Sequence, residues 1–337
     1  MAGRALGLAG ATALAGAGAA RLRRRRQLIG QVPQQMRRAG LHVPMPITNR
    51  VVLEQVRARR QGASEVIDGV TCQAVTLPGT DATLWTYEHP SRSDASGALI
   101  WLHGGGFISG SAPASHDFCS QLAADLGLFV VNVDYRLAPE HPFPAGFDDC
   151  FDALLWIHAH AHELGINPDR IVVAGSSAGA GLAAAVAQRA HDEGLELAFQ
   201  LLVYPMLDDR SALRRDLPSL TWSAASNRYA WKSYLGHPAG EPEERAYAVP
   251  ARRKDLSGLA PAWIGIGDLD LFHEEALDYA DRLRASGVTC LTREEQGMYH
   301  GADAARPDAP QMKAFRAEIL QILQTIFDQG QAISSVD

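Results

Sequence analysis

The chain contains 337 residues, of which 47% are hydrophobic and 20% are charged. This ordinary globular balance excludes a fully disordered or collagen-like chain. The four cysteines form no C-x-x-C pair, which argues against a zinc ribbon or a disulfide scaffold. Residues 1–53 hold nine arginines and no acid, whereas residues 54–337 hold 22 basic and 38 acidic side chains. The larger, acidic part of the chain is therefore a poor partner for nucleic acid.

The first 30 residues form a basic segment without a core-like pattern. Arg4 is followed by a stretch of Ala, Gly and Leu, and then by Arg21 and the arginine run 23–26. A signal peptide or membrane anchor would need a more hydrophobic stretch, with its arginines in front. An organelle transit peptide would be acid-free, as here, but rich in serine. We expect a flexible segment over 1–30, of which residues 1–25 are dispensable for catalysis.

No run of about 18 apolar residues with large side chains exists, so we expect no stable membrane span. We therefore predict a cytoplasmic protein. The N-terminal segment leaves export or membrane association open. The sequence does not decide between a monomer and a homodimer.

After residue 60, short apolar runs alternate with segments of helical spacing. Strands are predicted over 70–77, 83–87, 98–102, 128–134, 170–175, 198–204, 262–267 and 288–293. Helices are predicted over 147–163, 178–189, 274–286 and 310–328. Continuous β-branched runs separated by helices indicate an α/β fold with a mostly parallel sheet covered on both faces. Residues 207–258 break this rhythm, and we predict a helical insertion there.

The pentapeptide 175–179, Gly-Ser-Ser-Ala-Gly, lies between a buried strand and a helix. A nucleophile elbow has this arrangement, because a tight strand-to-helix turn needs small neighbours and lifts its central side chain toward substrate. The central residue is Ser177. The alternative is a serine that merely caps the helix.

Three consecutive glycines follow His103 at the end of another predicted strand. Their N–H groups are free to point at a ligand, as the tetrahedral oxyanion of acyl transfer requires. The expected oxyanion hole uses the N–H groups of Gly104, Gly105 and Ala178. A flexible loop or a phosphate-binding turn is the alternative, but neither phosphate-loop glycine pattern is present.

A serine nucleophile needs a base, and the base needs an orienting acid. After an elbow of this kind the acid and then the histidine follow in loops behind later strands. Asp270 and His300 meet that demand, and Asp268 is a rival acid. His273 opens a helix and is the less suitable base. No metal site is predicted: the only spaced histidines, 158, 160 and 162, lack further ligands.

Five motifs together resemble the hormone-sensitive-lipase-like branch of the α/β-hydrolase esterases: HGGGF at 103–107, DYRLAPEHPFPA at 134–145, GSSAG at 175–179, DLDLF at 268–272 and MYHG at 298–301. The resemblance covers residues 60–325 and implies a triad of Ser177, His300 and Asp270 with no cofactor. The residue before the nucleophile departs from the family: Ser176 stands where Asp or Thr is common. Within the DYRLAPE motif we expect Arg136 and Glu140 to pair and brace the site.

The resemblance also implies the α/β-hydrolase fold with a helical cap. The cap would combine residues 31–60 with the insertion 207–258, over a catalytic core of residues 61–206 and 259–330. Aromatic side chains of the cap and of the glycine loop are expected to line the substrate pocket: Phe107, Trp222, Trp231 and Tyr234. Packing between cap and core is the alternative role for each.

The sequence therefore predicts a serine carboxylic-ester hydrolase that acts on small esters with short to medium acyl chains, through an acyl-enzyme. One rival is a non-catalytic ligand-binding member of the same fold, which would have lost a triad residue. The other keeps the triad but cleaves amides or lactones, or transfers acyl groups to alcohols.

Overall fold

One eight-stranded sheet forms the centre of the molecule, in the order β1-β2-β4-β3-β5-β6-β7-β8. The computed structural model describes residues 20–43, 45–59, 62–214, 217 and 219–329. The strands are β1 Thr71–Thr76, β2 Thr83–Glu88, β3 Ser96–Leu102, β4 Phe129–Asp134, β5 Ile166–Ser176, β6 Phe199–Val203, β7 Ala262–Gly267 and β8 Cys290–Glu295. β2 pairs antiparallel with β1 and β4, and all the other pairings are parallel.

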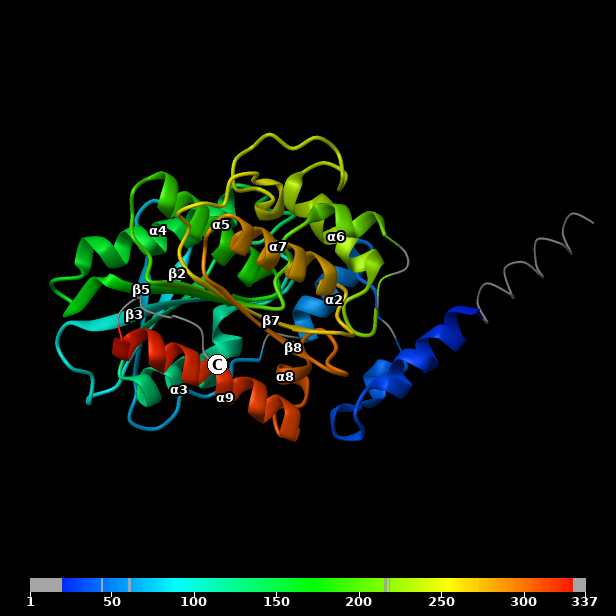
Figure 1. Ribbon diagram of the computed structural model, residues 1–337, viewed down its shortest axis with the longest axis horizontal. Coiled ribbons are helices and arrows are strands. Elements are labelled where there is room, and N and C mark those ends of the chain that lie inside the picture. The colour runs from blue at the N-terminus through cyan, green and yellow to red at the C-terminus, as the bar shows by residue number, and fades with distance from the viewer. Residues whose placement is uncertain (1–19, 44, 60–61, 215–216, 218, 330–337) are drawn as a thin grey trace, which may run out of the picture.

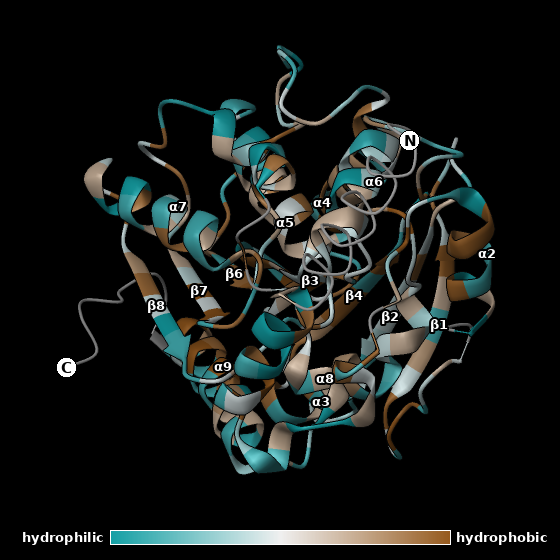
Figure 2. Ribbon diagram, turned by 90° about the vertical axis from the view of Figure 1, so that its right-hand side faces the viewer, coloured by the Kyte–Doolittle hydropathy of each residue, from teal (hydrophilic) through white to brown (hydrophobic). Residues whose placement is uncertain are grey.

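Burial explains the long apolar runs in the sequence. Every residue of β3, β6 and β7 is buried, whereas β1 at the sheet edge is mostly exposed. Central parallel strands have both faces covered, so they cannot alternate polar and apolar positions. Figure 2 shows hydrophobic residues concentrated in the middle of the sheet and hydrophilic ones on outer helices such as α7.

Helices cover both faces of the sheet (Figure 1). α4 (Ala145–His160), α5 (Ala178–Asp192) and α7 (His273–Ala285) lie on one face, and α3 (His116–Leu126) and α9 (Pro310–Gln329) lie on the other. The short helix α8 spans Ala302–Ala305. This arrangement confirms the predicted α/β fold with a mostly parallel sheet. The sequence prediction missed α3.

Two segments far apart in the sequence lie together on one side of the molecule. They carry α2 (Arg50–Arg59) and α6 (Ala224–Leu235), which are neighbours in Figure 1. Ser223 caps the start of α6 by accepting from the Ser226 N–H, and the Ile47 N–H donates to the Ser226 hydroxyl at 3.0 Å. The helical insertion is therefore bonded directly to the N-terminal segment.

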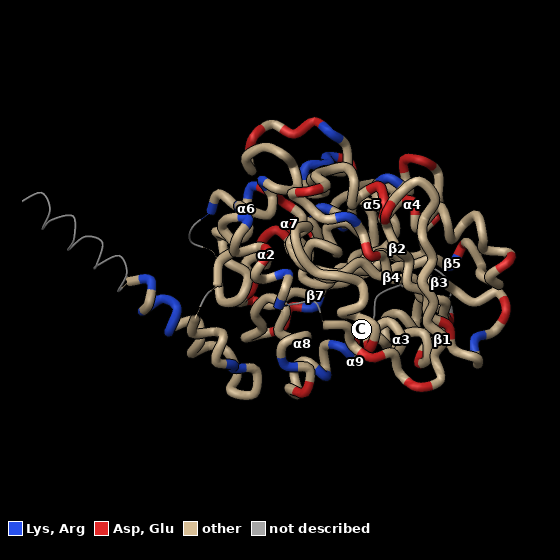
Figure 3. The backbone as a smooth tube through the Cα atoms, turned by 180° about the vertical axis from the view of Figure 1, so that it is seen from behind, with Lys and Arg blue, Asp and Glu red and all other residues tan. Residues whose placement is uncertain are grey.

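The N-terminal segment differs from its expected flexibility where it is described. Residues 20–31 are helical, the side chain of Ile29 is buried and that of Arg25 is hydrogen-bonded to three carbonyl groups. Figure 3 shows that several positions along this helix are Lys or Arg. The expectation for residues 1–19 lies outside the described residues. No helix in the described part of the chain is long and apolar enough to cross a membrane.

The predicted pair of Arg136 and Glu140 is wrong. Arg136 binds Asp149 on α4 instead, through Nε at 2.9 Å and Nη2 at 2.8 Å, and these hydrogen bonds raise the pKa of the guanidinium. Glu140 binds Arg57 and Arg50 of α2. Asp149 is fully buried and needs a cationic partner, whereas Glu140 lies near the surface.

Replacing Arg136 with Ala should lower the free energy of unfolding by about 3 kcal/mol, because it leaves the buried Asp149 carboxylate unpaired. Urea unfolding measures the change. The control is Arg50→Ala, which removes an exposed partner of Glu140 and should change the midpoint far less. Equal losses in the two variants would contradict the structural role of the Arg136–Asp149 pair.

Candidate active site

Ser177 stands in a sharp turn between β5 and α5. Its backbone has φ 57° and ψ −120°, a strained conformation for a residue with a side chain. A Cβ on Gly179 would lie 2.0 Å from the Leu102 carbonyl oxygen, and one on Gly175 would lie 2.5 Å from the Gly179 carbonyl carbon. Only glycine fits at either position. The Ser177 N–H donates to the Val203 carbonyl at 2.8 Å, which anchors the turn to β6.

The structure brings the three predicted side chains into one hydrogen-bonded chain. The Ser177 Oγ lies 2.8 Å from His300 Nε2, and His300 Nδ1 lies 2.7 Å from Asp270 Oδ2. The other oxygen of Asp270 accepts from the Phe272 N–H at 2.9 Å. Asp270 is 1% exposed and Ser177 is 6% exposed, so both ends of this hydrogen-bonded arrangement are shielded from solvent.

Two aromatic rings that the sequence reasoning missed hold the His300 imidazole edge-on. Tyr204 and Phe272 lie 4.9 and 5.1 Å from it, centroid to centroid. Burial, together with the Asp303 carboxylate, raises the pKa of Tyr204 well above its ordinary value. Its neutral phenol donates to Asp303 at 2.8 Å, which fixes the ring. Phe272 is the last residue of the DLDLF motif, and Tyr204 directly follows β6, but no sequence signal gave either ring a role beside the histidine.

Asp268, the rival acid, has another partner. Its Oδ1 accepts from the Gly297 N–H at 2.6 Å, and its own N–H donates to the Glu295 carbonyl at 3.3 Å. Asp268 therefore joins the loop after β7 to the loop that carries His300. The geometry favours Asp270 as the partner of the imidazole.

The glycine loop lies against the turn that carries Ser177. A Cβ on Gly104 would lie 3.2 Å from the Ser177 Cβ. Gly105 has φ 134°, and its carbonyl accepts from Ile108 and Ser109, which closes the loop. Within the described residues, the N–H groups of Gly104 and Gly105 donate to no backbone carbonyl. Ala178 begins α5, where the first N–H groups lack helical partners. Unpaired donors are thus available beside Ser177.

His103 packs against the glycine loop and bonds to its backbone. Its ring stacks on Tyr135 at 4.2 Å, Nδ1 donates to the Gly104 carbonyl at 2.9 Å, and the Tyr135 hydroxyl donates to the His103 carbonyl at 2.7 Å. Burial lowers the pKa of His103, which keeps the imidazole neutral. Its contacts give it a structural place rather than a catalytic one.

Three of the four predicted pocket residues form one packed cluster. Phe107 stacks on Tyr234 at 4.0 Å and lies 5.2 Å from Trp231, and all three are buried. The cluster joins the glycine loop to the inner face of α6. Trp222 sits apart, against Gly106, where a Cβ would lie 2.4 Å from its ring. Trp222 therefore packs directly on the glycine loop.

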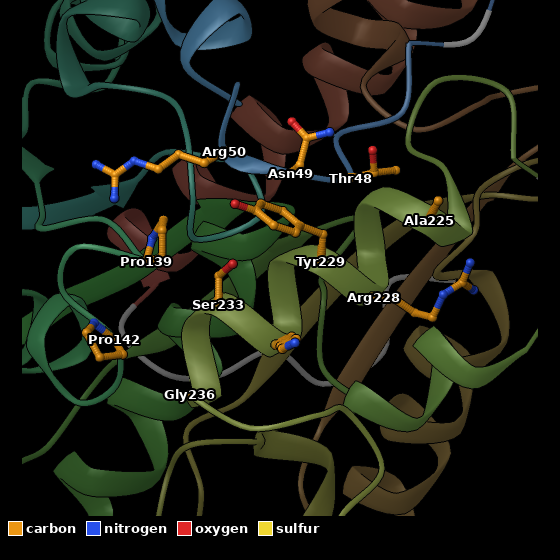
Figure 4. A pocket seen from close by; sticks show the side chains of 11 residues that line it. Thr48, Asn49, Arg50, Pro139, Pro142, Ala225, Arg228, Tyr229, Ser233 and Gly236 are labelled. Carbon is orange, nitrogen blue, oxygen red and sulfur yellow. The ribbon is translucent and has the colours of Figure 1, made fainter. Parts of the chain in front are cut away.

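An open pocket of about 740 Å³ lies on the outer side of α6, away from these residues (Figure 4). Its lining combines α6 with the start of α2 and the loop 139–142, and includes Arg50, Arg228, Tyr229 and Lys232. None of the predicted site residues lines it. Among the described residues no cluster of three or more His, Cys, Asp or Glu side chains could hold a metal ion.

Together, the fold and the hydrogen-bonded Ser-His-Asp arrangement are those of an α/β hydrolase. Residues 99–304 match a family model described as the alpha/beta hydrolase fold. Esterase LipI of Mycobacterium tuberculosis is 37% identical over 226 residues, which cover 64% of this chain and 68% of that protein. The ethyl acetate hydrolase of Pseudomonas putida is 30% identical over 287 residues, covering 80% and 88%.

Solved structures agree with these relatives. A bacterial heroin esterase superposes with a TM-score of 0.82 and 35% identity, over 89% of this chain and 99% of that one. Esterase LipW from Mycobacterium marinum follows with a TM-score of 0.77 and 30% identity, over 89% and 97%. The chain belongs to the α/β-hydrolase family, in its hormone-sensitive-lipase-like esterase branch, and is a hydrolase of the carboxylesterase type.

Replacing Asp270 with Asn should reduce kcat/KM by several orders of magnitude, because the amide favours the wrong tautomer of His300. Asp268→Asn is the matched control and should cost far less, since Asp268 bonds only to the backbone of neighbouring loops. Steady-state kinetics on one p-nitrophenyl ester compares the two variants. A larger loss for Asp268→Asn would reverse the assignment.

Proposed function

We propose that the protein hydrolyses carboxylic esters with short to medium acyl chains through a covalent acyl-enzyme on Ser177. The observation that carries the proposal is the hydrogen-bonded chain from Ser177 Oγ through His300 to Asp270, at 2.8 and 2.7 Å. These distances are within the reach that a nucleophile, its base and an orienting acid require.

In the proposed first half-reaction, Ser177 Oγ attacks the ester carbonyl carbon and His300 Nε2 takes the hydroxyl proton. The carbonyl oxygen becomes an oxyanion held by the N–H groups of Gly104, Gly105 and Ala178, and each such donor is worth roughly 3 kcal/mol. The C–O bond to the alcohol then breaks, and His300 returns the proton to the leaving oxygen. Asp270 holds the imidazole in the required tautomer.

In the second half-reaction, water attacks the acyl-enzyme carbonyl while His300 takes a proton from it. The oxyanion forms in the same hole, and its collapse releases the carboxylic acid and restores the Ser177 hydroxyl. His300 returns this proton to Ser177 Oγ, so each half-reaction passes one proton through the imidazole, and the cycle needs no co-reactant except water.

Two features support a bounded substrate pocket. The Ser177 side chain is almost fully covered, at 6% exposure, and Trp222 packs directly on the glycine loop beside it. A relative is named for the hydrolysis of ethyl acetate, an ester with a two-carbon acyl group. We infer that the substrate pocket is closed at a short distance from Ser177, so that long acyl chains do not fit. An open lipid-facing groove would accept them.

Ser177→Ala should lower kcat by about 10⁴-fold or more without unfolding the protein, because it deletes only the nucleophile. Ser176→Ala is the neighbouring control and should be mild, since that side chain takes no part in the proton relay. The measurement is turnover of p-nitrophenyl butyrate together with the far-UV circular dichroism spectrum. Near-normal turnover in Ser177→Ala would refute the elbow assignment.

Activity should rise and then fall with acyl length, with the maximum within roughly C2–C8, because each methylene that fits adds about 0.8 kcal/mol of burial and one that meets a wall costs strain. The test is kcat/KM over C2 to C16 p-nitrophenyl esters. A maximum at C12 or beyond, or activation at an oil–water interface, would instead make this protein a true lipase. Parallel amide and lactone substrates test the rival chemistries.

A further inference from the structure

The stretch of the cap immediately before α6, residues 219–222, contacts three different parts of the molecule. We name residues 219–222 the cap bridge. Its backbone carbonyls face the N-terminal helix, its threonine hydroxyl faces the backbone of the histidine loop, and its tryptophan covers the glycine loop. We name residues 20–41 the N-terminal arm. The four residues of the cap bridge therefore join this arm to both halves of the candidate active site.

Arg25 holds the first two residues of the cap bridge. Its Nη1 donates to the Ser219 carbonyl at 2.9 Å and its Nη2 donates to the Leu220 carbonyl at 2.8 Å, while Nε donates to the Leu41 carbonyl at 2.8 Å. The planar guanidinium presents these donors in a fixed fork, so one side chain sets two segments relative to each other.

The second pair of cap-bridge residues touches the site. The Thr221 hydroxyl donates to the His300 backbone carbonyl at 2.6 Å. Trp222 lies so close to Gly106 that a Cβ there would approach within 2.4 Å of its ring. A displacement of the cap bridge would therefore move the backbone of His300 and release the loop that carries Gly104 and Gly105.

The N-terminal arm also contacts the histidine loop directly. The Tyr299 hydroxyl donates to the Met36 carbonyl at 3.0 Å, and Arg306 Nε donates to the Gln35 carbonyl at 3.0 Å. Gly297 lies against Pro33, where a Cβ would come within 2.4 Å of the proline ring. The arm and the loop thus form one continuous packed surface around His300.

We propose that Arg25 is a positioning residue for ester hydrolysis: acting through Thr221, it holds the His300 backbone at the distance that the bond to Ser177 requires. This inference rests on the proposed function, and it replaces the expectation that residues 1–25 are dispensable for catalysis. Arg25 touches neither substrate nor a reacting group, so its effect passes through the cap bridge. A misplacement of about 1 Å at a catalytic group can cost on the order of 100-fold in rate. Loss of the Arg25 guanidinium should therefore produce a measurable fall in kcat.

Arg25→Ala should lower kcat roughly tenfold with little change in KM, because the histidine is misplaced while the substrate contacts remain. Arg26→Ala is the matched control, since Arg26 is the exposed neighbour on the same helix, and it should match the wild type. Arg25→Lys should resemble Arg25→Ala, because one ammonium cannot reach three carbonyls at the fork's geometry.

A double-mutant cycle tests the route through the cap bridge. Thr221→Val removes the hydroxyl donated to His300 and should lower kcat to a similar degree, whereas Thr221→Ser keeps the hydroxyl and should restore it. The double variant Arg25→Ala/Thr221→Val should lose no more than the worse single variant, because both changes break one connection. Multiplied losses would show that Arg25 does not act through Thr221.

The outcomes separate this inference from the function on which it rests. If the wild type fails to hydrolyse esters, or if a fluorophosphonate does not inactivate it, the proposed function falls. If the wild type is active and Arg25→Ala changes only the melting temperature, with kcat equal to that of Arg26→Ala, the positioning role is refuted. If Arg25→Ala does not fold, Thr221→Val and Thr221→Ser still decide: equal kcat in these two refutes the route.

Discussion

The hydrogen bond between Ser177 Oγ and His300 Nε2 joins two loops that are 123 residues apart in the chain, and the rest of the candidate site depends on it. The parallel strands bring its ends together, because the carboxyl ends of β5, β7 and β8 lie at one edge of the sheet. The elbow then lifts Ser177 into place at the cost of a positive φ, which the glycines and the bond to Val203 make tolerable. The strained conformation of Ser177 persists only because the surrounding structure holds it in place. The loops around the turn must therefore be well anchored.

Contacts from outside the hydrogen-bonded Ser177–His300–Asp270 chain hold these loops in place. Asp268 ties the acid loop to the histidine loop, and Tyr204 and Phe272 fix the orientation of the imidazole. Beyond them lies the cap bridge. The cap bridge is therefore bonded to the backbone of His300 as well as packed on the glycine loop.

The sequence predicted the parts of the site that are local. The tight turn and the triple glycine are visible as short motifs, because each depends on neighbouring residues. Asp270 and His300 are 30 residues apart and were predicted from their order behind later strands. Contacts between distant segments were not predictable in this way. Arg136 was paired with Glu140, four residues away, although its partner Asp149 lies on the next helix. Within the arginine run all side chains look alike, and only the fold shows that Arg25 meets three carbonyl groups.

Trapping of the acyl-enzyme tests the central claim most directly. Wild-type protein mixed with excess p-nitrophenyl butyrate, quenched in acid during turnover and digested, is analysed by peptide mass spectrometry. The account predicts a butyryl adduct on the hydroxyl of Ser177, and none in the Ser177→Ala variant treated in the same way. Turnover without an adduct on the elbow peptide, or an adduct that persists in Ser177→Ala, would contradict the account.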